Sequence, residues 1–203
     1  MSPLLLPPQL AAALEAGSLA LFPTDTLPAL AATPRHAATI WTCKARPREK
    51  PLILMGADLT QLVEFLGVVW QEPWLEKARS CWPGAFTLVL PIQVEVTEAL
   101  HPGGATLGLR VPACEQAREL LRRTGPLATT SANRSGEPAA RDESEAAALF
   151  PELPLLGPLP WPPGSGAAST VLAWSMPLDG VPSGWQILRA GATVPGEQRS
   201  PGC

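Results

Sequence analysis

The sequence lacks tyrosine altogether and has only two histidines, His36 and His101. A metal site built from several histidines is therefore excluded. Its four cysteines are scattered and include no C-x-x-C pair: Cys43, Cys81, Cys114 and Cys203. This spacing predicts neither a disulfide framework nor a zinc site, and it favours a reducing, cytoplasmic location.

Charged residues are also scarce, at 16% of the 203 residues, whereas apolar residues make up 46%. This is the composition of a globular chain with a substantial core and not of a disordered one. The net charge of −3 argues against nucleic-acid binding over the whole surface. The first seventeen residues have leucines but no basic start, and Pro7-Pro8 interrupts them, so we predict no signal peptide and no membrane span.

Sequence motifs of covalent or dinucleotide chemistry are missing as well. The chain has no Gly-x-Ser-x-Gly elbow, no Walker A motif and no Gly-x-Gly-x-x-Gly fingerprint. Asp25 is the one acid among the polar loop residues discussed below, and a lone loop aspartate is more often a turn or cap residue than a base. Catalysis by a protein nucleophile is not predicted.

The most informative stretch is Ser131-Ala132-Asn133. A short apolar run, 126–128, ends there in hydroxyl and amide side chains followed by Gly136 and Pro138. This pattern is typical of a buried strand that leads into a polar loop, and ligands of open α/β sheets bind beyond the carboxyl ends of strands. The alternative is an ordinary strand followed by a turn.

Basic residues gather in a second stretch, 35–50, which holds five of them against Glu49 alone: Arg35, Lys44, Arg46, Arg48 and Lys50. Such a cluster is either a solvated surface or an anion site. Together with the hydroxyl-rich loop Pro23–Pro28, it gives an array of cations and hydroxyls suited to a polyanion such as a nucleoside triphosphate, whose chemistry needs mostly positioning and charge stabilisation.

Apolar periodicity predicts short helices and strands in irregular order. The expected helices are 9–16, 35–43, one starting at Asp58 or Thr60, 72–81, 115–123 and 142–149. The expected strands are 18–22, 51–55, 85–91, 106–111, 169–174 and 185–189. The proline-rich segment 151–166 is expected to be irregular, and residues 195–203 to be a disordered tail after a single domain, 1–194. This mixture predicts an α/β fold with a twisted mixed sheet and flanking helices.

Lys44-x-Arg46 combined with Ser131-x-Asn133 resembles the paired signature of the YrdC-like (TsaC) threonylcarbamoyl-adenylate synthases. Further pieces fall in the same order as in that family: Phe22–Thr26, Lys50–Leu52, Trp82–Gly84 with Phe86–Leu90, Gly108–Pro112, Ser169–Val171 and Ile187–Gly191. The similarity covers roughly residues 10–192. It implies a basic concave face and a nucleotidyltransferase that converts L-threonine, bicarbonate and ATP, with Mg²⁺, into threonylcarbamoyl-AMP and pyrophosphate.

The resemblance also implies roles for individual residues. The ATP phosphates would be held by Lys44, Arg46, Lys50, Thr106, Asn133 and Arg189. The threonine would be surrounded by Thr26, Arg110, Ser131 and Ser169, with Arg110 on its carboxylate. No protein-bound metal is implied, and the product would pass to partner proteins that modify tRNA to threonylcarbamoyladenosine.

The chain departs from the family in its first loop. Leu27-Pro28-Ala29 stands where the family usually has Val-Tyr-Gly, and Met55 stands where some members place a polar ring. Two alternatives therefore accompany the enzyme hypothesis. One is a non-catalytic RNA-binding protein, for tRNA or double-stranded RNA, that has lost the threonine pocket. The other is an adenylating enzyme with a different carbamoyl acceptor.

Overall fold

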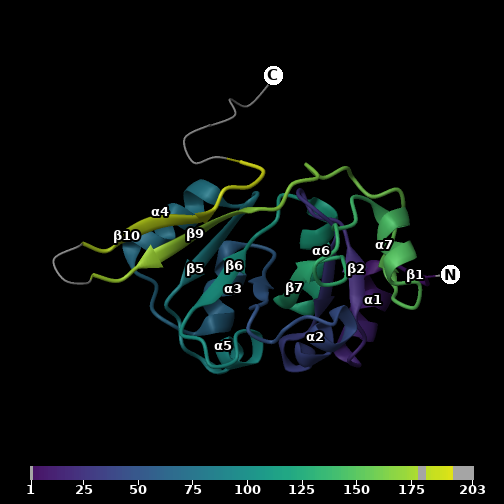
Figure 1. The fold of residues 1–203 in the computed structure, drawn as a ribbon, viewed down its shortest axis with the longest axis horizontal. Helices are drawn as coiled ribbons and strands as arrows, with labels where there is room; N and C mark the ends of the chain where they lie inside the picture. Colours follow the sequence, from purple (N-terminus) through teal and green to yellow (C-terminus); the bar gives the residue numbers. More distant parts are fainter. Residues whose placement is uncertain (1, 178–181, 194–203) are drawn as a thin grey trace, which may run out of the picture.

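The computed structural model of the chain describes residues 2–177 and 182–193, which form one mixed sheet flanked by helices (Figure 1). The strands are β1 (Leu4–Leu5), β2 (Ala20–Phe22), β3 (Ala29–Ala32), β4 (Ile53–Met55), β5 (Phe86–Leu90), β6 (Leu107–Arg110), β7 (Leu127–Ser131), β8 (Leu155–Leu156), β9 (Thr170–Ser175) and β10 (Gly184–Arg189). Their order across the sheet is β1-β8-β2-β3-β7-β4-β6-β5-β9-β10, with both parallel and antiparallel neighbours. The predicted α/β fold with a mixed sheet is confirmed.

The helices are α1 (Pro7–Glu15), α2 (Ala38–Lys44), α3 (Leu59–Leu66), α4 (Glu72–Cys81), α5 (Glu95–Leu100), α6 (Glu115–Thr124) and α7 (Glu143–Leu149), with a 3-10 turn at Pro34–His36. Helix α3 begins after Asp58, whose carboxylate accepts a hydrogen bond from the backbone N–H of Gln61 at 2.8 Å. No helix within the described residues is long and apolar enough to cross a membrane.

Two expected boundaries are wrong in ways that affect the site, and several elements were not predicted. The expected helix 35–43 is a 3-10 turn followed by α2, so that Lys44 ends a helix and does not begin a loop. The strand expected to end at Ala128 continues to Ser131, because Thr129 and Thr130 pair with β3. Strand β3 was not predicted, and helix α5 and the short strands β1 and β8 were missed. The expected tail, 195–203, lies outside the described residues.

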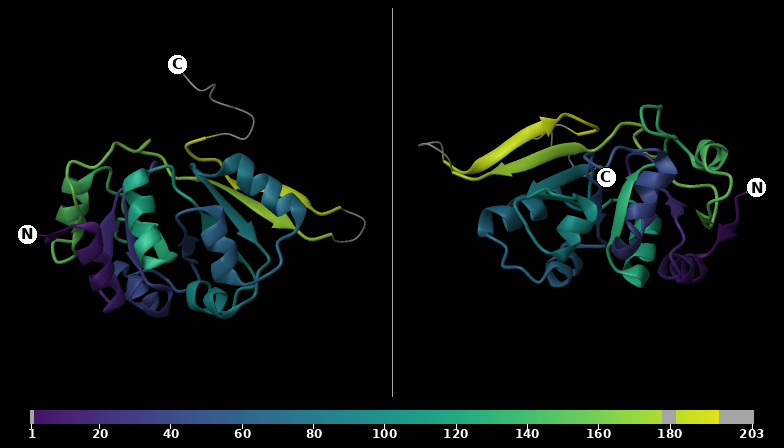
Figure 2. Two further views of the ribbon diagram at one scale, coloured as in Figure 1. Left: turned by 180° about the vertical axis from the view of Figure 1, so that it is seen from behind. Right: turned by 60° about the horizontal axis from the view of Figure 1, so that its bottom comes forward.

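The two faces of the sheet differ in how fully helices cover them. Side chains alternate between the faces along each strand. One face carries leucines of β4, β5 and β6, which pack with residues of α2, α3, α4, α5 and α7 in the larger apolar cluster. On the other face α1 and α6, which lie side by side (Figure 2), cover strands β2 and β3 through a smaller cluster. The smaller cluster also takes in Leu127 of β7 and Met55 of β4. The remainder of that face, over β6, β5 and β9 and the rest of β7 and β4, is not covered by these helices.

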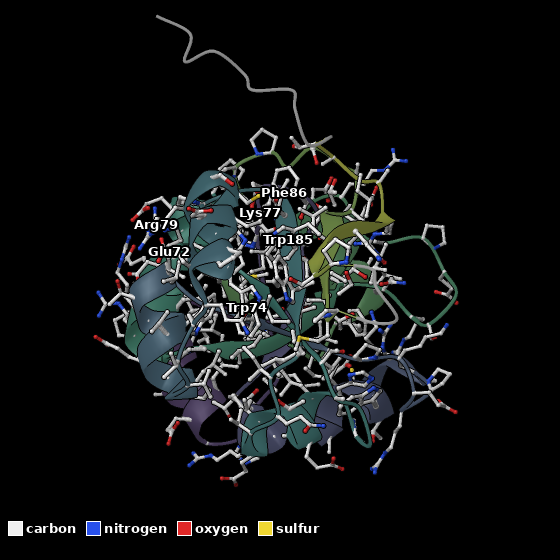
Figure 3. The ribbon with its side chains drawn as sticks, turned by 90° about the vertical axis from the view of Figure 1, so that its left-hand side faces the viewer. Glu72, Trp74, Lys77, Arg79, Phe86 and Trp185 are labelled. Atoms are coloured by element: carbon white, nitrogen blue, oxygen red, sulfur yellow. The ribbon has the colours of Figure 1, made fainter. Side chains whose placement is uncertain are left out.

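Strands β9 and β10 form a hairpin that projects at the end of the sheet farthest from the N-terminus (Figures 1 and 2). Helix α4 supports it: Figure 3 shows Lys77 of α4 beside Trp185 of β10, with the Lys77 Nζ 6.0 Å from the ring centroid. Trp185 also meets Trp174 of β9 edge-on, with ring centroids 5.3 Å apart. These aromatic contacts hold β10, and with it Arg189, against the rest of the sheet.

Candidate functional site

The uncovered part of the sheet is the floor of a cavity of about 580 Å³. Every second residue of its strands faces this space: Thr129 and Ser131 of β7, Ile53 and Met55 of β4, Gly108 and Arg110 of β6, and Thr87 and Val89 of β5. The volume is that of an ordinary small-molecule site. No acidic side chain is among its lining residues, which include Arg46, Lys50, Arg110 and Arg189. The cavity is therefore a basic hollow suited to anions.

One end of the cavity is cationic and lies near the start of β6. Arg46 and Lys50 line it with Thr106 and His101. The Arg46 guanidinium donates to two backbone carbonyls, from Nε to Lys50 at 3.2 Å and from Nη2 to Pro51 at 3.0 Å. These bonds fix the plane of the guanidinium and leave its other N–H groups for an anion.

The other end is organised by Arg110, at the opposite end of β6. The side chain is 5% exposed, and its three nitrogens donate to three different groups. Nη2 donates to the Asp25 carboxylate at 2.8 Å, Nη1 to the Thr26 hydroxyl at 2.8 Å, and Nε to a backbone carbonyl at 3.3 Å. Burial lowers the pKa of Arg110, and the neighbouring Asp25 carboxylate opposes this shift. One N–H on each terminal nitrogen is left over by these bonds and could hold a ligand carboxylate.

Asp25 makes structural contacts on two sides. Besides the ion pair with Arg110, it accepts a hydrogen bond from the backbone N–H of Ala113 at 3.0 Å. Through these two contacts the loop between β2 and β3 is tied to the Arg110 end of β6 and to the residues that follow it. Asp25 could be singled out in the sequence as the one acid of its loop, but its partner Arg110 could not, because it lies 85 residues away.

A second polar cluster stands beside Arg110. The hydroxyls of Thr87 and Ser169 are 2.9 Å apart, and both residues are buried. Arg189 donates from Nη2 to the Ser169 carbonyl at 2.8 Å and from Nε to the same oxygen at 3.2 Å. Arg189 is thus brought together with Ser169, which was predicted to bind the threonine substrate. It lies away from Arg46 and Lys50 along the sheet. Its predicted contact with phosphate stays a prediction.

Lys44 and Asn133 are the two predicted site residues that do not line the cavity. Lys44 is 1% exposed, and its ammonium donates to the Ser131 carbonyl and, at 2.9 Å, to the Asn133 side-chain oxygen. Both residues lie behind Ser131, which does line the cavity. Of the ten predicted residues, the cavity brings together the other eight: Thr26, Arg46, Lys50, Thr106, Arg110, Ser131, Ser169 and Arg189.

Burial of Lys44, with a smaller contribution from the Arg46 charge, lowers its pKa to about 7. Because the folded-state pKa lies below the unfolded one near 10.5, the unfolded chain binds more protons between these values, and the contribution of Lys44 to stability rises with pH in this window. We expect the free energy of unfolding of the wild type, relative to Lys44→Met, to rise by up to about 1.4 kcal/mol per pH unit above pH 7. Urea unfolding of both proteins at pH 7 and 9.5 measures this difference; a difference that shrinks with pH would contradict it.

Several lining residues were missed by sequence reasoning. His101 and Thr87 line the cavity and were not predicted. Thr24, which lies in the hydroxyl-rich loop, also lines it but was not among the predicted site residues. Thr87 could have been found from alternation in 86–90, where it is the polar residue among apolar ones. His101 had no such signal, because it follows a helix that was not predicted.

The unusual residues of the first loop fit the fold. Ala29 lies in β3, paired with Ser131, and needs no left-handed backbone. Pro28, which has no N–H, serves as an acceptor: its carbonyl takes a hydrogen bond from Ala132 at 2.9 Å. Met55 is buried in the floor. The absent tyrosine and glycine therefore leave the loop ordered and tied to the Ser131–Asn133 segment.

A metal site made by the protein alone is not evident in residues 2–177 and 182–193, where no three His, Cys, Asp or Glu side chains come close enough to hold an ion. Protein-bound magnesium usually has one or two carboxylate ligands and shares substrate phosphates. The cavity offers hydroxyls and cations in their place. These groups suit the phosphates of an anionic ligand.

Comparison with known proteins gives the family. The Sua5/YciO/YrdC family model, described as "Telomere recombination", matches residues 12–191. The chain belongs to this family. Among curated relatives, threonylcarbamoyl-AMP synthase of Pseudomonas syringae pv. syringae is 34% identical over 145 residues, which cover 70% of this chain and 78% of the relative. The enzyme of the same name from Bacillus subtilis is 37% identical over 143 residues, but they cover only 39% of its length.

Solved structures of the family agree with the fold. Sua5 of P. abyssi in complex with L-threonine is 32% identical, with a TM-score of 0.78 over 90% of this chain. The chain spans only 53% of that Sua5 chain. YciO of E. coli, at 22% identity and a TM-score of 0.71 over 91% of this chain and 88% of its own, supports the fold alone. The predicted family membership is thereby confirmed.

Proposed function

We propose that this family member catalyses formation of threonylcarbamoyl-AMP and pyrophosphate from L-threonine, bicarbonate and ATP. The observation that carries the proposal is a single acid-free cavity with cations at both ends of β6. An anionic nucleotide and an amino acid, held by its carboxylate, can be bound in it together. Relatives that bear the enzyme's name, and the Sua5 structure with L-threonine, favour this reading over the RNA-binding alternative.

In this proposal the triphosphate lies at the cationic end. Arg46 and Lys50 would neutralise its charge, and Thr106 would donate a hydroxyl hydrogen bond. Guanidinium binds phosphate in a bidentate manner, while the exposed Lys50 ammonium acts as a mobile point charge. Magnesium would arrive with ATP, bound to its phosphates.

The amino acid would lie at the other end. Its carboxylate would meet the two N–H groups of Arg110 that the ion pair with Asp25 leaves over. Thr26 and Ser169 would surround its remaining polar groups. Because Asp25 balances the Arg110 charge, Arg110 is kept in place when no ligand is bound.

The chemistry needs no protein nucleophile. The threonine amine adds to bicarbonate with loss of water, and a carbamate oxygen then attacks the α-phosphorus. The bond from that phosphorus to the bridging oxygen breaks, and pyrophosphate leaves with the bond electrons. The protein contributes alignment of the two substrates and stabilisation of charge on the phosphates. We further propose that partner proteins transfer the threonylcarbamoyl group to tRNA, in the cytoplasm.

Pyrophosphate release from ATP, assayed with each substrate omitted in turn, tests this function. The proposal requires release that depends on both threonine and bicarbonate. Release that depends on another amine would select an enzyme with a different carbamoyl acceptor. ATP binding without release under any condition would overturn the proposal in favour of the non-catalytic protein.

We expect Arg46→Ala to weaken ATP binding by about 10- to 100-fold, because a hydrogen bond to a charged group is worth roughly 1.5–3 kcal/mol. Calorimetry with MgATP measures the change. Arg48→Ala, an exposed cation two residues away that does not line the cavity, is the matched control and should leave the affinity unchanged. Equal losses in both variants would show a general charge effect and no specific contact.

A further inference from the structure

The buried ammonium of Lys44 connects two parts of the chain behind the cavity. It lies in the last turn of α2 and donates to the Ser131 carbonyl and to Asn133 Oδ1, the latter at 2.9 Å. The backbone carbonyl of Lys44 also accepts a hydrogen bond from Ser135 at 3.0 Å. The end of α2 is thus joined to the segment 131–135 by both the side chain and the backbone of one residue.

These contacts fix the orientation of the Asn133 amide. The Lys44 Nζ donates to the amide oxygen of Asn133, at 2.9 Å. On the other side, the amide nitrogen faces two carbonyls, of Arg134 and Glu137, both at 2.8 Å, which can only accept. If the amide were reversed, its oxygen would face these two carbonyl oxygens, and neither could donate a hydrogen bond to it. Asn133 therefore has one allowed orientation.

That orientation in turn decides the direction of the Ser131 hydroxyl. Ser131 Oγ lies 2.7 Å from Asn133 Oδ1, and since this oxygen can only accept, the hydroxyl proton points toward Asn133 and away from the cavity. The oxygen lone pairs of Ser131 are left to face the cavity that the residue lines. Ser131 is consequently an acceptor toward any ligand.

We propose that Lys44 is a positioning residue that touches no substrate and acts through Asn133 to make Ser131 a hydrogen-bond acceptor for the amino group of the amino-acid substrate. This inference rests on the proposed function. ATP phosphates carry no donor at neutral pH, whereas an amine does. By strand register Ser131 lies level with Pro51 and Thr106, at the phosphate end, and the amino group must reach toward that end because the carbamate formed on it attacks the α-phosphorus.

The test is a set of variants, Lys44→Met, Asn133→Ala, Ser131→Ala and the double variant Lys44→Met/Asn133→Ala. Each should raise the KM for threonine about 5- to 10-fold, the value of one neutral hydrogen bond. The double variant should be no worse than the more affected single variant, because both changes interrupt one path. The Kd for MgATP should stay within about twofold of wild type. Arg48→Met, which removes a nearby exposed cation, should change neither value.

Additive losses of ATP affinity in Lys44→Met and Asn133→Ala, with an unchanged KM for threonine, would overturn the inference and make both residues phosphate ligands. Failure of the proposed function is recognised separately, as wild-type protein without threonine-dependent turnover. In that case melting temperatures of the ligand-free variants decide the positioning part: the double variant should lose no more than the larger single loss, and summed losses would contradict it.

Discussion

Arg110→Met is expected to remove amino-acid binding and to lower the free energy of unfolding by about 3–5 kcal/mol, the usual effect of breaking a buried ion pair. The variant keeps most of the side-chain volume but leaves the Asp25 carboxylate, 18% exposed, without its cation. The loop carrying Asp25 and Thr26 also loses its anchor on β6. Urea unfolding measures the stability, and calorimetry with threonine in the presence of a non-hydrolysable ATP analogue measures binding.

A second variant separates folding from binding at this position. Arg110→Met combined with Asp25→Leu removes both charges, and an apolar pair at such a site is often as stable as the ion pair. We expect it to recover part of the lost stability but none of the threonine affinity. Arg79→Met, which removes one partner of an exposed ion pair with Glu72 on α4, should affect neither (Figure 3). If Arg110→Met lost ATP affinity alone, the assignment of Arg110 to the amino acid would be wrong.

Gly164→Ala should disturb the same end of the cavity from the outside. Residues 164–166 lie on the first loop: Ser165 donates to the Asp25 carbonyl and Gly166 to the Thr26 carbonyl, both at 3.0 Å. A Cβ at Gly164 would lie 2.3 Å from the Thr26 carbonyl oxygen and 2.9 Å from that of Thr24. Because both contacting atoms belong to the backbone, either segment 164–166 or the first loop must move, and the movement displaces Thr26 from Arg110.

We expect this substitution to cost about 1–3 kcal/mol, as overpacking of a close contact usually does. The melting temperature should fall by roughly 2–4 °C per kcal/mol, and the KM for threonine should rise more than that for ATP. Gly184→Ala is the matched control, because no atom lies within 4 Å of its Cβ position and its backbone is extended. Identical melting curves for the two variants would show that segment 164–166 is not packed on the first loop as described.

Much of the fold could be predicted because local signals agree with it. Helix α4 starts and ends as expected, with a proline in its first turn and a polar exposed face. Strand β3 could not be predicted, because Ala-Leu-Ala-Ala has no strand preference of its own. These residues are a strand only because β2 and β7 flank them and supply hydrogen-bond partners on both sides. Tertiary pairing overrides local preference at this position.

The site divides in a similar way between what residue types reveal and what only geometry reveals. Phosphate-suited cations and small hydroxyls could be read from the chain, and eight of the ten predicted residues line one cavity. What could not be predicted is which of these residues contact one another in space. Lys44 was expected in a loop, yet its position at the end of α2 buries it behind Ser131. The pairing of Asp25 with Arg110 joins residues that are 85 positions apart in the chain, which no local pattern encodes.

The central claim is that one cavity brings ATP and an amino acid together for a reaction. Its most direct test is mass spectrometry of the product formed from ATP, threonine and ¹³C-bicarbonate by the wild-type protein. The account predicts threonylcarbamoyl-AMP that carries one ¹³C, in an amount equal to the pyrophosphate released, and none from Arg46→Ala/Arg110→Met. Release of pyrophosphate without this labelled adenylate, or no adenylate at all from protein that binds ATP, would contradict it.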